Sequence, residues 1–283
     1  MQELFKHIVV LTDIEGKKQS LLGFSAELAH LCKAKLDLVH LLNHLNYAIG
    51  SPLDYHLAPV VYINNGKREI ENKLKLIASR IGYENGLQIS VKVLTEQPEK
   101  SLKQYAMETG VDLVILQACN NKLTMDYFRN SHVERIINYM ECPVLTITGH
   151  KNANGIKSIV IPVGDLIPRR KLKLAFLVAK VYSAKIHLVT SAGVGEDSEK
   201  CINNLLSACA MLKAWGNVQV ECKRLDGADY GQSVIRYARK IFADLIVVNP
   251  GRETRLSGWI NFLLGARIYT DSGIPVLIVK HQN

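Results

Sequence analysis

One group of residues whose types could hold a small anion lies near the end of the chain, where three arginines surround two glycines. They are Gly251, Arg252, Arg255, Gly265 and Arg267. Glycine allows backbone N–H groups to approach a phosphate closely, and the planar guanidinium group of arginine binds phosphate oxygens in pairs. The stretch is therefore one candidate phosphate site. Ordinary solvated surface explains the same residues, and we slightly favour that interpretation.

No group of residues in the sequence matches a catalytic pattern. The chain lacks a Walker A sequence, a G-x-S-x-G elbow and an H-E-x-x-H metal motif. Residues 193–195 imitate the start of a dinucleotide-binding fingerprint, but they follow a predicted second strand and the third glycine is missing. His40 and His44 could face one loop, although a histidine at a strand end is more often a hydrogen-bonded structural residue. We therefore predict that the protein is not an enzyme.

The composition indicates a folded protein whose charge is unevenly distributed. A length of 283 residues favours two domains, and no apolar run has the length of a membrane helix or a signal peptide. Residues 1–150 hold 16 Lys and Arg against 16 Asp and Glu, whereas residues 151–283 hold 19 against 10. The excess in the second half fits a surface for an anionic partner. We favour simple solvation, since no dense basic run with interleaved aromatics accompanies it.

The six cysteines show neither a C-x-x-C pair nor the spacing of a zinc site. This pattern predicts buried, reduced thiols, and together with the missing export signal it predicts a cytoplasmic protein. Cys201 and Cys209 lie eight residues apart on a predicted helix, where they share one face and cannot form a disulfide with each other.

Five segments of the first half recur in the second half in the same order, which predicts a tandem duplication. The matching pairs are 7–13 with 158–164, 34–40 with 184–190, 101–106 with 233–238, 112–116 with 244–248, and 142–145 with 274–277. The offset is about 150 for the first two pairs and 132 for the others. The second copy is therefore shorter after its second strand, and we predict that the polar stretch 43–66 of the first copy is an insertable loop rather than core.

In each copy, short runs rich in Val, Ile and Leu alternate with stretches of helical period, which is typical of parallel strands joined by helices. Strands are predicted at 7–12, 36–42, 88–94, 112–117 and 144–148, and again at 158–163, 185–190, 217–224, 244–249 and 275–279. Helices at 20–33 and 68–81 have clear apolar periodicity. The predicted fold is α/β, with two tandem, open, doubly wound, mainly parallel five-stranded sheets of Rossmann-like form, in residues 1–150 and 151–283.

Ligands of such sheets bind beyond the carboxyl ends of the strands, where the strand order reverses. The residues predicted to lie there are Asp13, Leu41 and Gln117 in the first copy, and Gly164, Ser191 and Asn249 in the second.

The ordered set of motifs, present twice, resembles the universal stress protein family in its tandem form. The resemblance rests on a first strand ending in Asp13, a second ending in His40-Leu41, Asp-Leu-Val-Ile at 112–115 and Cys-Pro-Val-Leu at 142–145. It covers nearly the whole chain and implies the adenine nucleotide alpha hydrolase-like form of the fold. It also implies an intramolecular pseudo-dimer, paired through the last strands at 144–147 and 276–279, because a single domain would leave these apolar edges unpaired.

Members of this family that bind ATP carry, after the fourth strand, Gly, two residues, Gly, nine residues, and Gly followed by Ser or Thr. The first copy keeps this spacing without the glycines, as Gln117, Asn120, Asn130 and Ser131. Asn tolerates the left-handed backbone, so the turns could persist while the Asn side chains crowd the phosphate space. The resemblance implies that Asp13 faces the nucleoside and Ser131 the phosphates. Ser131 also fits a helix N-cap paired with Glu134.

The second copy has lost different parts of the same motif. Gly251 and Gly265 remain, but 13 residues separate them, Ala266 replaces the hydroxyl residue and Gly164 replaces the first-strand Asp. For a small phosphate ligand, local geometry outranks net charge, because the donors must lie within hydrogen-bonding distance of the oxygens. We therefore expect any mononucleotide beside Asp13 and Ser131 in the first copy.

We interpret the chain as a non-enzymatic stress-response protein with degenerate adenine-nucleotide binding, so that ATP or AMP binds at most weakly. One alternative is a slow ATP hydrolase or nucleotide-dependent switch, for which only Asp13 and Asp126 offer a carboxylate. The other is a binding protein for an anionic macromolecule through the basic second half. The sequence predicts no metal site and no membrane contact and disfavours nucleic acid, and a homodimer stays open.

Overall fold

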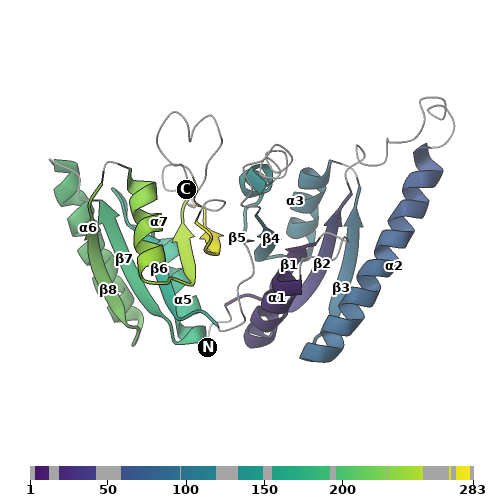
Figure 1. Cartoon of the computed structure of the whole chain (residues 1–283), viewed down its shortest axis with the longest axis horizontal. Coiled ribbons are helices and arrows are strands. Elements are labelled where there is room, and N and C mark those ends of the chain that lie inside the picture. Colours follow the sequence, from purple (N-terminus) through teal and green to yellow (C-terminus); the bar gives the residue numbers. More distant parts are fainter. Residues whose placement is uncertain are drawn as a thin grey trace. The chain divides into compact units, whose positions relative to one another are not determined.

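The computed structural model of the chain contains two compact α/β units, each with a mainly parallel sheet and helices packed against it (Figure 1). It describes residues 4–12, 19–42, 59–95, 97–118, 133–148, 155–191, 196–227, 229–250, 268 and 272–280. No helix in these ranges is long and apolar enough to cross a membrane.

The first compact unit comprises residues 1–117 and 138–141. Its elements in chain order are β1 (His7–Leu11), α1 (Gln19–Cys32), β2 (Lys35–Leu41), α2 (Pro59–Asn85), β3 (Ile89–Leu94), α3 (Pro98–Thr109) and β4 (Leu113–Gln117). These strands are parallel and follow the order β3-β2-β1-β4 (Figure 1). Because β2 and β4 lie on opposite sides of β1, the strand order reverses there, and a ligand is expected beyond the carboxyl ends of β1 and β4.

The second compact unit comprises residues 118–137 and 142–283. Its described elements are β5 (Val144–Ile147), β6 (Ser158–Pro162), α5 (Arg169–Tyr182), β7 (Lys185–Ser191), α6 (Glu196–Trp215), β8 (Val220–Leu225), α7 (Tyr230–Lys240), β9 (Leu245–Val248) and β10 (Val276–Ile278). The strand order is β5-β10-β9-β6-β7-β8, and all described neighbours are parallel except β5 and β10.

Strand β5 belongs by sequence to the first repeat and pairs with the last strand of the second. The two strands run antiparallel, with Val144 opposite Ile278 and Thr146 opposite Val276. Every residue of both strands is buried, so the pairing removes two apolar strand edges from water. The predicted pairing of the terminal strands is confirmed.

The Asp-Leu motif that recurs in both repeats has a structural role. The carboxylate of Asp112 accepts hydrogen bonds from the backbone N–H groups of Lys6 and His7, at 2.8 and 3.2 Å. In the second repeat Asp244 accepts from Lys157 and Ser158 in the same way, at 2.9 and 3.0 Å. These bonds satisfy amide groups at the start of the central strand, which explains why an acidic residue stands before an apolar strand.

All ten predicted strands are present, with ends within three residues of the predicted ones. The prediction of a loop at 43–66 is wrong for its last part, because α2 begins at Pro59 and runs to Asn85. Proline suits the first turn of a helix, since its fixed φ is already helical. The Asn-Asn-Gly sequence at 64–66 disfavours a helix locally, but elongation of an existing helix costs little compared with its nucleation.

The cysteines differ from the prediction in burial. Cys32 is buried, whereas the other described cysteines are only half-buried: Cys142, Cys201, Cys209 and Cys222. None of these five cysteines forms a disulfide. The prediction of buried thiols is therefore wrong for those four, because spacing along a sequence does not reveal which cysteines lie at the margin of a core.

Candidate functional site

The candidate ligand site is the edge where the parallel strands end, which we call the carboxyl edge of each unit. In the first unit, Leu41 ends β2 and Gln117 ends β4, as predicted. In the second unit, Ser191 ends β7, while Gly164 and Asn249 follow β6 and β9 closely. The other predicted site residues lie outside the described residues; they are Asp13, Asn120, Asn130, Ser131, Gly251 and Gly265.

At the first carboxyl edge, His40 holds the chain that leaves β1. Its Nδ1 lies 2.9 Å from the carbonyl oxygen of Thr12, and a carbonyl can only accept, so Nδ1–H is the donor. The backbone N–H of Thr12 donates to the carbonyl of Val39 at 3.0 Å. The prediction of a hydrogen-bonded structural histidine is thus confirmed for His40.

Gln117 is the residue of the first edge with unused hydrogen-bonding capacity. Its side chain is half-buried, and its Oε1 is buried without a hydrogen-bond donor from the described part of the chain. An unsatisfied buried acceptor costs free energy, which a ligand N–H would recover. Gln117 occupies the position of the first glycine in the spacing typical of the family.

The second carboxyl edge is covered by its own side chains. Lys171 Nζ donates to the carbonyl of Pro162 at 2.6 Å, and Asn204 Nδ2 donates to the carbonyl of Gly164 at 3.0 Å. The hydroxyl of Thr190 donates to the carbonyl of Val163 at 2.8 Å. Backbone oxygens just beyond β6 are therefore occupied by protein donors.

Tyr230 extends this cover to the neighbouring strand. Its hydroxyl donates to the carbonyl of Val189 at 3.0 Å and lies 3.5 Å from the carbonyl of Val163. The repeat offsets align Lys171 with Leu21 and Tyr230 with Pro98. Leu21 and Pro98 have no side-chain hydrogen-bond donor. Leu21 is buried, as is Lys171, so an ammonium group has taken a core position in the second repeat.

The opposite ends of the strands, which we call the amino edge, carry a buried polar cluster in each unit. In the first unit Asp37 Oδ2 accepts from His7 Nε2 at 2.7 Å, from the Tyr105 hydroxyl at 2.5 Å and from Lys35 Nζ at 3.3 Å. His7 Nδ1 lies 3.0 Å from the carbonyl of Thr109. Both ring nitrogens thus face acceptors, one of them the carboxylate of Asp37 and the other a backbone carbonyl.

The pKa values in the first cluster follow from its geometry. Burial would raise the pKa of Asp37, but the hydrogen bonds from Tyr105 and His7 and the nearby cations prevail, so this pKa is lowered. The pKa of Tyr105 is raised by burial and by the bond to Asp37. Asp37 therefore stays ionised at neutral pH and binds α3 to β1 and β2.

The second cluster keeps the tyrosine and replaces the acid by a histidine. His187 Nδ1 lies 3.1 Å from the Tyr237 hydroxyl and 3.7 Å from Glu221 Oε2, which also pairs with Lys185 at 2.6 Å. Burial lowers the pKa of His187. The negative charge of Glu221 raises this pKa, and the positive charge of Lys185 lowers it further. Sequence reasoning missed both clusters, although the recurring Tyr-Ala pair at 105–106 and 237–238 was a visible signal.

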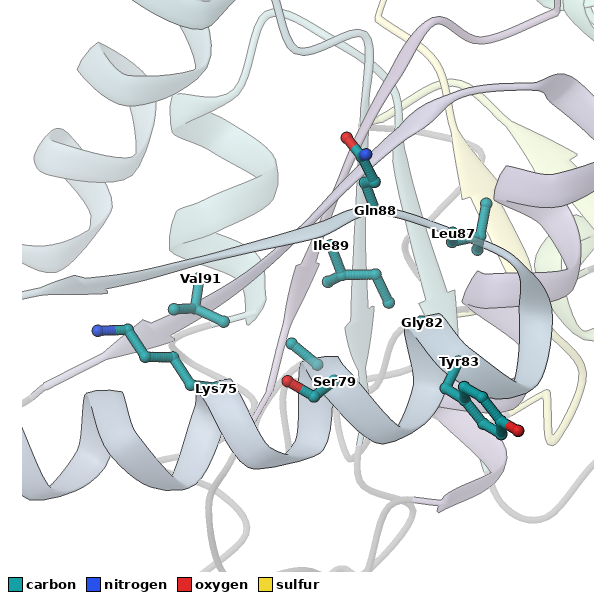
Figure 2. Close-up of a pocket in the computed structure, with 9 residues that line it drawn as sticks. Lys75, Ser79, Gly82, Tyr83, Leu87, Gln88, Ile89 and Val91 are labelled. Carbon is teal, nitrogen blue, oxygen red and sulfur yellow. The ribbon is translucent and has the colours of Figure 1, made fainter.

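A hollow of about 430 Å³ lies between the last turns of α2 and the start of β3 in the first unit. Figure 2 shows Lys75, Ser79 and Tyr83 on the helix and Gln88, Ile89 and Val91 on the strand side. Lys75 is already paired with Glu71 at 3.0 Å. The hollow is thus not part of the carboxyl edge, and the ammonium group of Lys75 is already paired.

Throughout the described ranges, no three His, Cys, Asp or Glu side chains are grouped as metal ligands would be.

Comparison with solved structures shows the same fold in other proteins. A universal stress protein from Archaeoglobus fulgidus DSM 4304 has a TM-score of 0.73 at 13% identity, with 99% of each chain covered. A functionally unknown protein from Pseudomonas aeruginosa PAO1 has 0.58 at 18%, covering 98% of this chain and 92% of that one. The cytoplasmic domain of a prokaryotic cation chloride cotransporter has 0.56 at 14%, covering 97% and 94%. The predicted tandem α/β fold is thereby confirmed.

Comparison at the level of sequence identifies the family. A search of curated proteins found no match. The family model described as Universal stress protein family matches residues 4–148, which is just over half of the chain and includes both strand ends of the first carboxyl edge. The chain therefore belongs to the universal stress protein family.

Proposed function

We propose that this chain is a non-enzymatic, cytoplasmic stress-response protein in which only the first repeat keeps a site for an adenine nucleotide. The nucleotide is ATP or AMP, and binding is weak because the phosphate-binding glycines are replaced at residues 117, 120 and 130. Membership of the family supports the stress role.

The observation that carries the proposal is the cover on the second carboxyl edge. Lys171, Asn204 and Tyr230 donate to backbone oxygens there. A nucleotide in that place would have to displace these contacts, and each displaced donor would need a new acceptor. In the first repeat His40 stands in the place of Thr190, and Leu21 and Pro98 stand at the positions aligned with the lysine and tyrosine donors.

The buried Oε1 of Gln117 offers an acceptor at the first edge, and the matched Asn249 of the second edge likewise has a buried side-chain oxygen, so this feature favours neither repeat over the other. Adenine carries an exocyclic amino group, and such a donor suits an unsatisfied carbonyl oxygen.

The proposal that the protein is not an enzyme is supported by the two amino-edge clusters. Their titratable side chains hydrogen-bond to one another, at the end of the strands opposite to the ligand edge.

Isothermal titration of the full chain with ATP and with AMP tests the proposal. We expect weak binding that is lost in Asp13→Ala and kept in Gly265→Ala, a change at a glycine that the second repeat has kept from the motif. Substituting glycine at Asn120 and Asn130 together should raise the affinity for ATP, since the spacing is kept and side-chain bulk is removed.

The reverse pattern, with binding lost in Gly265→Ala and kept in Asp13→Ala, would assign the nucleotide to the second repeat and overturn the proposal. No gain in affinity from the double glycine variant, with an unchanged circular dichroism spectrum, would show that more than the glycines is missing. Phosphate release from ATP that disappears in Asp13→Ala would make the protein an enzyme.

A further inference from the structure

Two cysteines from different elements of the second unit face each other. Cys222 lies on β8, the outermost strand in the order of this unit, and Cys209 lies on α6, which packs against β7 and β8. Side chains alternate along a strand, so Cys222 and Glu221 point to opposite faces of the sheet. Glu221 contacts His187, which bonds Tyr237 of α7, and Cys222 is therefore on the face that α6 covers.

The position of Cys209 on its helix fits the same face. The buried stripe of α6 includes Leu205, Ala208 and Leu212, and Cys209 lies one turn from both leucines. Cys209 and Cys222 are both half-buried, so small oxidants can reach them. The thiol of Cys222 lies within hydrogen-bonding reach of Cys209.

The two thiols have different roles in this contact. Burial raises the pKa of Cys222 to about 12, and the bond to Cys209 adds to this effect, while the charge of Lys213 opposes it. Cys222 therefore keeps its proton and donates it toward the Cys209 sulfur. Lys213 follows Cys209 by one turn on α6 and so lies on the same side of the helix.

We propose that Cys209 and Cys222 form a reversible disulfide when the protein meets hydrogen peroxide, and that this bond ties α6 to β8. In the first step the Cys209 sulfur attacks one peroxide oxygen, the O–O bond breaks, and water leaves together with the thiol proton. In the second step Cys222 attacks the resulting sulfenic sulfur, the S–S bond forms and a second water leaves. Two thiols lose two electrons and two protons, and one peroxide is reduced to two waters.

The disulfide closes a short ring from residue 209 to residue 222 and constrains the unfolded chain. A ring of this size gives measurable stabilisation where the native geometry is not distorted. We therefore expect the oxidised protein to melt several degrees above the reduced protein, with the difference removed by dithiothreitol.

Oxidation of the reduced full-length chain with hydrogen peroxide tests the proposal. The intact mass should fall by about 2 Da for one disulfide, and the count of reactive thiols should fall by two from the six in the sequence. Non-reducing peptide mapping should join the peptides of Cys209 and Cys222. Cys209→Ser and Cys222→Ser should each abolish the link, whereas Cys201→Ser, a half-buried cysteine on the same helix, should keep it.

Several results would overturn the inference. One is a wild-type peptide map that joins any other pair of cysteines or gives a disulfide-linked dimer. Another is a gain of about 32 Da at Cys209 or Cys222 without a disulfide, which marks irreversible oxidation to a sulfinic acid. Because the map is made on the wild-type chain, it decides the matter even where a serine variant folds poorly.

Discussion

The two repeats differ in how they treat the ends of their parallel strands. In the first, His40 is the described side chain that covers the chain leaving β1. In the second, Lys171, Thr190 and Tyr230 all donate to backbone oxygens at the corresponding edge. The two repeats therefore present different hydrogen-bonding groups at the ends of strands that follow the same order.

At the amino edge the repeats differ in whether one matched position carries a charge. Asp37 and His187 are matched by the repeat, and each contacts the matched tyrosine, Tyr105 or Tyr237. Asp37 is an anion that accepts several hydrogen bonds. Burial lowers the pKa of His187 and so favours its neutral form. The same structural position therefore responds to acid over different pH ranges in the two units.

The largest effect on this comparison should come from Asp37→Ala. It removes the shared acceptor and leaves the buried His7 and the Tyr105 hydroxyl without their partner. Breaking a buried charged contact costs about 3 to 5 kcal/mol, so the free energy of unfolding should fall by that amount. His187→Ala in the second unit breaks mainly one neutral hydrogen bond and should cost about 1 to 3 kcal/mol. Urea unfolding followed by circular dichroism measures both, and equal losses would contradict the proposed difference.

Acid should weaken the second unit before the first. The pKa of His187 is lowered in the folded state. The stabilisation that the His187 side chain contributes is therefore complete above its unfolded pKa of 6.5, and it is lost as the pH falls through its folded pKa. The pKa of Asp37 is also lowered, from 3.8, so its contribution is lost only at more acidic pH. Hydrogen exchange at about pH 5 should therefore show weaker protection of β7 and α7 than of β2 and α3, relative to about pH 7.5.

The variant His187→Gln supplies the control for this pH dependence. Glutamine keeps a hydrogen-bonding side chain but does not titrate, so the loss of protection between neutral pH and about pH 5 should shrink in β7 and α7. A second unit whose acid response is the same with and without His187 would mean that another group governs it.

A smaller effect should follow from Tyr230→Phe, which removes the hydroxyl that covers the carbonyl of Val189. The ring and its packing remain, so the expected loss is about 1 kcal/mol in the free energy of unfolding. Nucleotide affinity measured by titration should not change if the first repeat holds the site. New binding in Tyr230→Phe would show that the tyrosine hydroxyl alone keeps the second edge closed.

The sequence predicted the elements well because their signals are local. Runs of Val, Ile and Leu marked the strands, and the repeat offset showed which strand ends correspond, so the positions of Leu41 and Gln117 were predicted correctly. The covering contacts could not be predicted, because Lys171 stands in a basic stretch that suggests surface. Its alignment with the buried Leu21 was the available signal, but only the tertiary contact to Pro162 shows what the amine does.

The smallest effect concerns Glu221, which has no acidic counterpart in the first repeat. His187 lies opposite Glu221 in the strand register, and Asp37 lies opposite Ser90. The charge of Glu221 is the one contribution that raises the pKa of His187, so Glu221→Gln should lower this pKa further. The free energy of unfolding should change by less than about 0.5 kcal/mol, because Glu221 and Lys185 are both well exposed and such pairs contribute little. An NMR titration that assigns His187 by its absence in His187→Gln measures the shift. A pKa that rises in Glu221→Gln would contradict the electrostatic account and would leave burial alone to separate the two clusters.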